Sequence, residues 1–100
     1  MAFNNIGNKV TLKGYVSSEI SQVSDYAIEF SISVPRKTHQ GECTYSDSLT
    51  VYVNDYATCQ FCKTHFFKSL SIVVKGEIRR FYNGDIKICS DSIAILSRKK

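Results

Sequence analysis

The sequence predicts a small all-β domain that carries a single helix. A length of 100 residues fits one domain and argues against two. Apolar and polar residues alternate along five segments, which is the period of half-buried strands. A further segment, between the third and the fourth of these, has its apolar residues at helical spacing. We therefore expect one domain over residues 1–100, with five strands and a helix between strands 3 and 4.

Composition and charge narrow the class of protein. The chain is 43% hydrophobic and 22% charged, as an ordinary globular protein is. No run approaches the roughly 20 apolar residues that span a bilayer, and the N-terminus lacks the pattern of a secretory signal, so a cytoplasmic protein with no membrane partner is expected. The net charge is +4, but Arg98, Lys99 and Lys100 supply +3 of it. The basic tip, residues 97–100, is expected to be flexible, so only the charges within the strands can argue for an anionic partner.

The first two strands are expected on either side of a polar loop. Alternation begins over residues 9–16, where Gly14 indicates a bend. Residues 17–24 are polar and are expected to form the loop. The second strand alternates cleanly over residues 28–34, and the proline that follows is expected to end it. Residues 35–46 then form a long polar connection, and long connections in small domains often carry function.

The third strand leads directly into the helix. Residues 48–53 alternate, and Asn54 or Asp55 can cap a helix. From Tyr56 the apolar spacing is helical for about three to four turns. Four aromatic residues are expected in the core: Tyr26, Phe61, Phe66 and Phe67.

The last two strands are expected to form a hairpin. The fourth strand covers residues 70–82, with Gly76 at a bend, and Asn83-Gly84 is a two-residue hairpin signal. The fifth strand, residues 85–96, changes its apolar parity, which indicates a bulge near residues 90–92. This element order is that of an OB-fold, a small five-stranded Greek-key barrel, and glycines within strands fit the curvature of a barrel. A split sheet covered by one helix is the alternative.

The chain contains four cysteines, Cys43, Cys59, Cys62 and Cys89. Two of them form a C-x-x-C that is followed by His65, but a zinc site needs four ligands with a second close pair, and no redox unit follows. We expect these two to be small buried hydrophobic residues on the helix, with no metal or cofactor. An enzyme is not expected, because neither His65 nor His39, in the long connection, lies in a nucleophile, phosphate-loop or metalloprotease motif.

Outward-facing side chains of the strands combine cations with aromatic rings. A protein that binds single-stranded nucleic acid needs Lys or Arg for phosphates and rings on which bases stack. Both types occur on the outward parity of strands one, three and four, beside the long connection, and around the last hairpin. The candidate binding residues are Lys13, Tyr15, Arg36, Lys37, Tyr45, Tyr52, Lys75, Arg79, Arg80, Phe81, Tyr82 and Lys87. Glu29 and Glu77 share the outward parity, so they either mark the edge of this surface or pair with a neighbouring Arg.

Three segments resemble bacterial and phage single-stranded DNA-binding proteins. Asn8-Lys-Val-Thr-Leu-Lys-Gly14 is similar to their opening strand, Val74-Lys-Gly-Glu-Ile-Arg79 to their fourth strand, and residues 88–96 to their closing strand. The resemblance implies an OB-fold that binds single-stranded DNA non-specifically in replication, recombination or repair. The chain has no Trp and ends in basic residues, whereas these proteins often stack bases on Trp and end in an acidic tail. Both departures favour an accessory member carried by a phage, plasmid or other mobile element.

Two other functions stay open. One is an OB-fold interaction module of a primosome-like replication complex, with a helicase or polymerase as its partner. The other is binding of single-stranded RNA, whose 2′-hydroxyl would be the distinguishing contact. Members of the family often assemble through strand edges, so the chain is also a candidate homo-oligomer.

Overall fold

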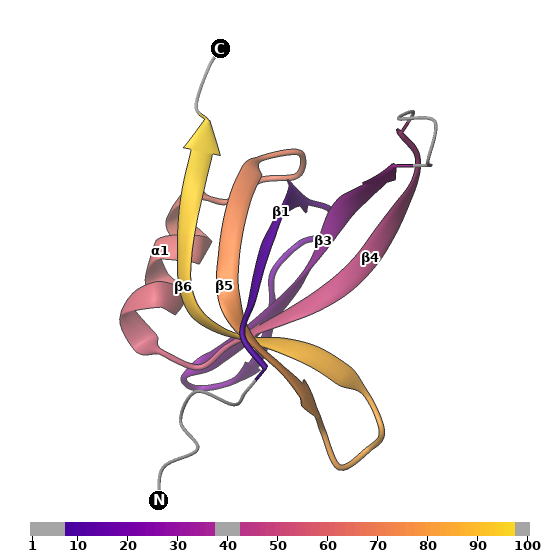
Figure 1. The fold of residues 1–100 in the computed structure, drawn as a ribbon. Helices are drawn as coiled ribbons and strands as arrows, with labels where there is room; N and C mark the ends of the chain where they lie inside the picture. The colour runs from indigo at the N-terminus through magenta and orange to yellow at the C-terminus, as the bar shows by residue number, and fades with distance from the viewer. Residues whose placement is uncertain (1–7, 38–42, 98–100) are drawn as a thin grey trace, which may run out of the picture.

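The computed structural model describes residues 8–37 and 43–97, with the backbone alone at residues 37, 43–45 and 97. Figure 1 shows a small barrel with one helix beside it. Within the described ranges, no helix combines the length and the hydropathy needed to cross a membrane. In chain order the elements are β1 (Val10–Val16), β2 (Ser21–Ser24), β3 (Ala27–Lys37), β4 (Cys43–Val53), α1 (Tyr56–His65), β5 (Ser71–Arg80) and β6 (Ile86–Ser97).

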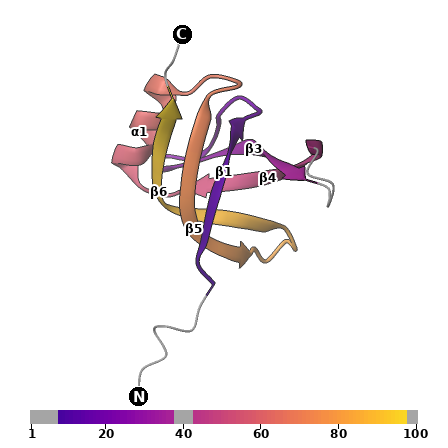
Figure 2. The same cartoon turned by 45° about the horizontal axis from the view of Figure 1, so that its top comes forward.

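The strands form one sheet that closes on itself. Its order is β1-β5-β6-β4-β3-β2, and the end of β1 also pairs with β3, through Tyr15 with Ser33 and Val16 with Ile32. The five long strands therefore make a barrel, from which the β3–β4 and β5–β6 hairpins project (Figures 1 and 2). The predicted OB-fold is confirmed, and the split-sheet alternative is wrong because the β1–β3 pairing closes the sheet.

A short strand lies within the loop predicted for residues 17–24. This strand, β2, pairs with β3, and all four of its residues are exposed. Since no side of β2 is buried, its sequence lacks the alternation that reveals a half-buried strand. Counting β2, the helix follows the fourth strand rather than the third, although it still follows the third strand of the barrel.

The predicted boundary at Pro35 is wrong, because β3 runs on to Lys37 and Pro35 lies opposite Ser46 of β4. Beyond Ser33, β3 has a ladder partner on one side only, and proline is tolerated at such an edge. The predicted connection is therefore much shorter, and its residues 38–42, including His39, lie outside the described residues. At the other end of the chain, Ser97 completes β6, and the rest of the predicted flexible tip is also outside the described residues.

Two glycines lie where strands approach each other closely. A Cβ at Gly14 would come within 2.5 Å of the Ser33 carbonyl oxygen, next to the point where β1, still paired with β5, also begins to pair with β3. A Cβ at Gly76 would come within 2.1 Å of the Cys89 carbonyl oxygen. Beside Gly76 the β5–β6 register skips Asp91, which confirms the bulge predicted in the last strand.

The core fills the barrel and includes one side of α1. Asp55 caps the helix, accepting a hydrogen bond from the Thr58 amide (2.9 Å). Cys59 and Cys62 are buried, as predicted, and burial is the main reason that the pKa of Cys62 rises to about 12. The expectation for the four aromatic residues holds only for Phe66, whose ring packs edge-on against Phe30 (5.3 Å between centroids). The other three are exposed: Tyr26, Phe61 and Phe67.

Candidate nucleic-acid interface

A row of outward side chains crosses the sheet where β4 and β6 pair. Glu29 of β3 lies opposite Tyr52 of β4, Tyr52 opposite Cys89 of β6, and Cys89 opposite Glu77 of β5. Directly opposed residues point to the same side of a sheet. We call the side on which these four residues lie the outer face.

Two of the predicted aromatic residues meet on the outer face. The Tyr52 and Phe81 rings are 5.2 Å apart between centroids and nearly perpendicular, and the Lys87 Nζ lies 4.5 Å from the Phe81 centroid. An ammonium over a ring in this way is a favourable cation–π contact. Tyr52 and Phe81 are half-buried, so part of each ring is open to solvent. The cluster thus supplies ring faces on which the bases of a single-stranded nucleic acid can stack.

The β5–β6 turn fixes the position of Phe81. Gly84 has a φ of 98°, a left-handed conformation that glycine adopts without strain. The Phe81 amide donates to the Asp85 carbonyl oxygen (2.7 Å), and the Gly84 amide donates back to the Phe81 carbonyl oxygen (2.8 Å). The predicted hairpin at Asn83-Gly84 is confirmed, but its loop is longer than the two residues predicted, since Phe81 bonds with Asp85 across it. The Asp85 amide also donates to the Asn83 side-chain oxygen (3.0 Å). These bonds hold the backbone of Phe81 beside the last strand.

Two cations of the outer face near Tyr52, Lys87 and Arg79, are paired with carboxylates. Lys87 pairs with Glu29, and the hydrogen bond to Glu29 is the main reason that the pKa of Lys87 is raised. Arg79 donates twice to one oxygen of Glu77, from Nη2 (2.6 Å) and Nε (2.9 Å), and these bonds lower the pKa of that carboxyl group. The interpretation that these carboxylates pair with a neighbouring Arg is confirmed for Glu77, whereas the partner of Glu29 is a lysine.

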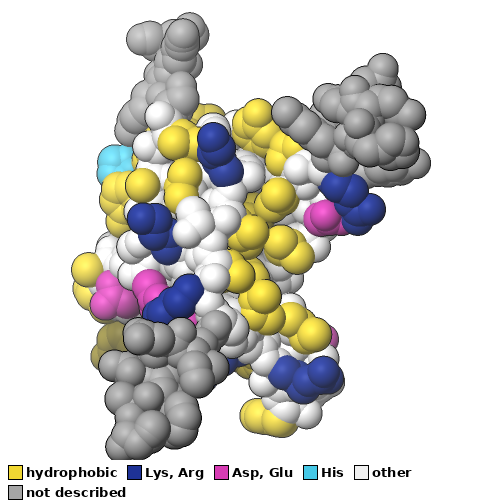
Figure 3. All heavy atoms as spheres, in the orientation of Figure 1, with side chains coloured by type: hydrophobic (Ala, Val, Ile, Leu, Met, Phe, Trp, Pro, Cys, Tyr) yellow, Lys and Arg dark blue, Asp and Glu magenta, His cyan; other side chains and the backbone are white. Residues whose placement is uncertain are grey.

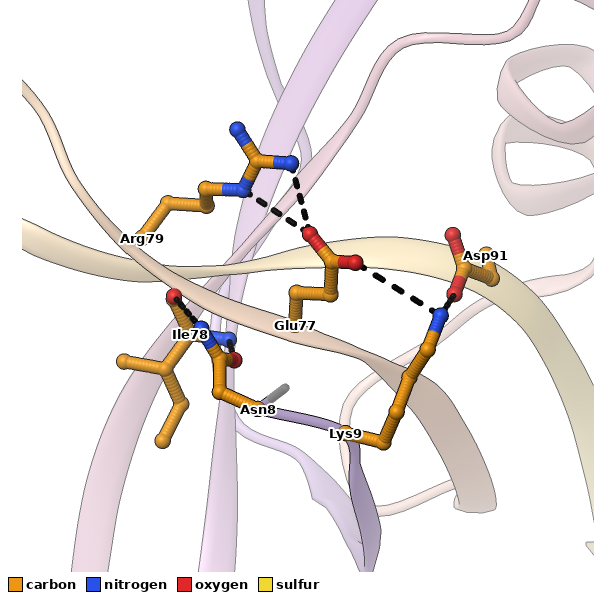
Figure 4. A network of polar contacts seen from close by, with 6 residues as sticks. All are labelled: Asn8, Lys9, Glu77, Ile78, Arg79 and Asp91. Carbon is orange, nitrogen blue, oxygen red and sulfur yellow. Dashed lines mark hydrogen bonds and ion pairs between the residues drawn. The ribbon is translucent and has the colours of Figure 1, made fainter. Parts of the chain in front are cut away.

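A lysine that sequence reasoning left out of the site completes this network. The Lys9 Nζ lies 3.5 Å from the second oxygen of Glu77 and 3.5 Å from an Asp91 oxygen, so that it bridges β5 and the β6 bulge (Figure 4). Asn8 anchors the same segment, since its side chain accepts from the Ile78 amide (2.6 Å) and donates to the Ile78 carbonyl oxygen (3.0 Å). The sequence could have identified Lys9 as a site residue, because it has the same outward parity as Lys13.

Three further predicted residues extend the outer face along β1 and β5. Lys75 lies on the same side of β5 as Glu77, and across the ladder it lies opposite Thr11, while Lys13 and Tyr15 follow on β1 with the same parity. All three are exposed. Tyr15 is opposite Ser71, eight positions from Arg79 along β5, which corresponds to about 26 Å. The structure therefore spreads these candidates along a strand instead of gathering them in one cluster.

Other predicted residues do not lie on the outer face. Arg80 is opposite Ile86, one step from the Arg79–Lys87 pair, so its side chain leaves the opposite side of the hairpin. Arg36 has the opposite parity to Glu29 and pairs with Asp47 near the end of the β3–β4 hairpin (2.6 Å). Tyr82 is fully exposed at the β5–β6 turn. The side chains of Lys37 and Tyr45 are outside the described residues.

A pocket of about 370 Å³ opens beside Tyr52 on the outer face. Its polar lining combines donors and acceptors. Only two of its residues, Tyr52 and Arg79, were among the predicted site residues. The bulge was predicted, but the sequence does not show which side chain a bulge turns toward a neighbour. The lining residues are Tyr52, Asn54, Glu77, Arg79, Cys89, Ser90 and Asp91.

Solved structures with a similar fold include single-stranded DNA-binding proteins. The small single-stranded DNA-binding protein of Streptomyces coelicolor is 12% identical, with a TM-score of 0.75 over 94% of this chain and 97% of that one. The Plasmodium falciparum SSB, solved in complex with single-stranded DNA, is 18% identical, with a TM-score of 0.69 over 90% and 95%. The N-terminal domain of PriB from Thermoanaerobacter tencongensis, a dimeric structure, is 16% identical, with a TM-score of 0.63 over 91% and 98%. No protein-family model matches this sequence, and no curated protein matches it either. At these identities the likeness establishes the fold.

Proposed function

We propose that this chain binds single-stranded DNA non-specifically through its outer face, without covalent chemistry, in replication, recombination or repair. The observation that carries the proposal is the cluster of Tyr52, Phe81 and Lys87, in which two half-open rings lie beside a cation. The two rings offer stacking surfaces to a base, and the Lys87 ammonium stabilises the Phe81 ring beside them. The fold is one that the Plasmodium falciparum SSB, solved with single-stranded DNA, also has.

Cations farther along β1 and β5 supply phosphate contacts beyond the cluster. Within the described part of the chain, neither Lys13 nor Lys75 has a carboxylate partner, in contrast to Arg79 and Lys87. The outer face extends about 26 Å along β5, a length that several nucleotides can follow, and OB-folds bind about 4–16 nucleotides. With phosphate contacts from these two lysines, the slope of log K against log salt would be about −1.4.

A fluorescence-anisotropy titration with oligo-dT tests the proposal. We expect binding at about 50 mM salt that weakens steadily toward about 200 mM, because phosphate contacts release counterions. Absence of binding at low salt, or binding that salt does not change, would contradict the proposal. Oligo-rU and duplex DNA run in parallel decide between DNA and RNA, since tighter binding of oligo-rU would favour the RNA-binding alternative.

A groove away from the outer face favours a protein-interaction module as the second candidate function. It has a volume of about 400 Å³, and the exposed ring of Phe67 lies at its wall beside Ile20 and Phe66. Lys63 and Lys68 at its rim complement a peptide that carries both acidic and aromatic residues, such as a segment of a helicase or polymerase. Titration with an acidic peptide containing Phe, against a scrambled-charge peptide, measures this function separately from DNA binding.

We also propose that the chain forms a homo-oligomer through β1. One edge of β1 pairs with β5 along Val10–Tyr15, whereas its other edge meets β3 only at Tyr15 and Val16, and an unpaired edge is a template for another strand. Hydrophobic side chains form a diagonal band between β1 and the β3–β4 hairpin (Figure 3). Sedimentation velocity should show a species larger than 11.3 kDa. Amide exchange at residues 10–14 should slow as protein concentration rises, and unchanged exchange would contradict this edge as the interface.

A further inference from the structure

Carboxylates on a surface that binds DNA require an explanation. Glu77 and Asp91 both line the pocket beside Tyr52, and a carboxylate repels phosphate. A carboxylate that faces a base has the opposite effect, since it accepts hydrogen bonds from base N–H groups. Resting on the proposed function, we infer that this pocket receives a single nucleobase and selects guanine at that one position, while the rest of the strand is bound without sequence preference.

The pocket has the size and the wall that a base needs. Its volume of about 370 Å³ is within the range of about 300–1,000 Å³ that is typical of ligand sites. Tyr52 is one of its walls, and the Phe81 ring at 5.2 Å supports the tyrosine from beside it. A base that stacks on the Tyr52 ring therefore presents its polar edge to the side chains around the pocket.

The β6 bulge brings Asp91 to the pocket. Ser90 lies opposite Gly76 and Ser92 opposite Lys75, so Asp91 has no ladder partner, and bulges commonly re-aim a side chain in this way. Lys9 contacts one Asp91 oxygen at 3.5 Å, a loose contact, and the side chain is 59% exposed. The carboxylate is thus oriented but accessible to a ligand.

The donors and acceptors match guanine better than the other bases. Guanine is the standard DNA base with two adjacent N–H donors, N1–H and N2–H, on its Watson–Crick edge, and the two oxygens of a carboxylate can accept both. Beside these donors lies O6, an acceptor, and an Arg is the usual donor to it. Arg79 uses one N–H of Nε and one of Nη2 for a single oxygen of Glu77 (Figure 4). Within the described residues this leaves the two N–H groups of Nη1 and the second N–H of Nη2 as donors for O6. Thymine, cytosine and adenine each lack the adjacent pair of donors.

Substituted oligonucleotides test this inference separately from the proposed function. Anisotropy at a fixed salt concentration compares oligo-dT with the same oligomer carrying one central dG, dC, dA or deoxyinosine. We expect dG to bind about five- to tenfold more tightly than dT, and deoxyinosine, which lacks the 2-amino group, to lose most of this gain. Asp91→Asn should bind dT at least as well as the wild type but lose the preference for dG. The matched control is Asp25→Asn, which removes an exposed carboxylate at the β2–β3 turn and should keep the preference.

Each outcome decides one of the two claims. The guanine pocket is supported if dG binds more tightly than dT and this gain is lost both when deoxyinosine replaces dG and when Asn replaces Asp91. Equal, salt-dependent binding of all oligomers overturns the pocket and leaves the proposed function intact, as does a dG preference that Asp91→Asn retains. Failure to bind any oligomer overturns the proposed function, and the pocket with it.

Discussion

Phe81 is a large apolar side chain at the end of a strand, yet no core residue surrounds it. It is half-buried against Tyr52 and Lys87, and the core cluster does not include it. Since its ring is available for stacking, Phe81→Ala should weaken oligo-dT binding by about 1–3 kcal/mol in an anisotropy titration. Phe67→Ala is the matched control, because Phe67 is 61% exposed beside the helix, away from the outer face. Equal losses in the two variants, with thermal unfolding unchanged, would contradict a stacking role for Phe81.

Cys62 makes stability sensitive to alkaline pH. Burial raises the pKa of its thiol from an ordinary 9.0 to about 12 in the folded protein. Its contribution to stability is therefore fully present below about pH 9 and is lost as pH rises toward 12, with a slope of up to about 1.4 kcal/mol per pH unit. Urea denaturation at several pH values, comparing the wild type with Cys62→Ala, measures this slope. The variant should show a shallower decline above about pH 9, and identical declines would assign the effect to other groups.

At the scale of the element, the close pairing of β5 with β6 beside the bulge depends on Gly76. A Cβ there would lie 2.1 Å from the Cys89 carbonyl oxygen and 2.9 Å from its carbon, which are backbone atoms that cannot rotate away. Gly76→Ala should therefore lower the free energy of unfolding by about 1–3 kcal/mol, the usual cost of overpacking, in urea denaturation. Gly84→Asn is the contrast, since a Cβ at Gly84 meets nothing within 4 Å and Asn tolerates a positive φ. A Gly76→Ala variant as stable as the wild type would contradict this prediction, because β5 and β6 would then have moved apart at this position without a cost in stability.

Elements with one buried side were predictable, and elements without one were not. Alternation located β1, β5 and β6, because burial of one side of a strand imposes a pattern on its sequence. The Asn83-Gly84 signal located the hairpin that joins β5 and β6. Neither β2, exposed throughout, nor the end of β3 from Pro35 to Arg36, also exposed, carries such a pattern, since neither buries one side in the core. The wrong prediction that Tyr26 lies in the core has the same cause. Its ring contacts Tyr56 on the surface (6.1 Å between centroids).

At the scale of the whole molecule, the sequence identified residues of the site but not their partners. Parity placed Tyr52 and Arg79 on one side of the sheet, which the structure shows as the outer face. It could not show that Lys87 would meet Glu29, 58 positions away, or that Lys9 would reach Asp91, because these contacts depend on how the barrel closes. The net charge of +4 therefore overstates the free positive charge of the outer face, where carboxylates already neutralise Arg79 and Lys87.

This pairing predicts that removing one carboxylate strengthens binding. Glu29→Gln leaves Lys87 without its ion-pair partner, so the ammonium becomes available to a phosphate. The affinity for oligo-dT should rise severalfold at low salt, and the slope of log K against log salt should steepen by about 0.7, one phosphate contact. Glu19→Gln is the matched control, because it changes the net charge equally but lies at the groove lined by Phe67. If both variants steepened the slope alike, net charge and not the release of Lys87 would account for the gain.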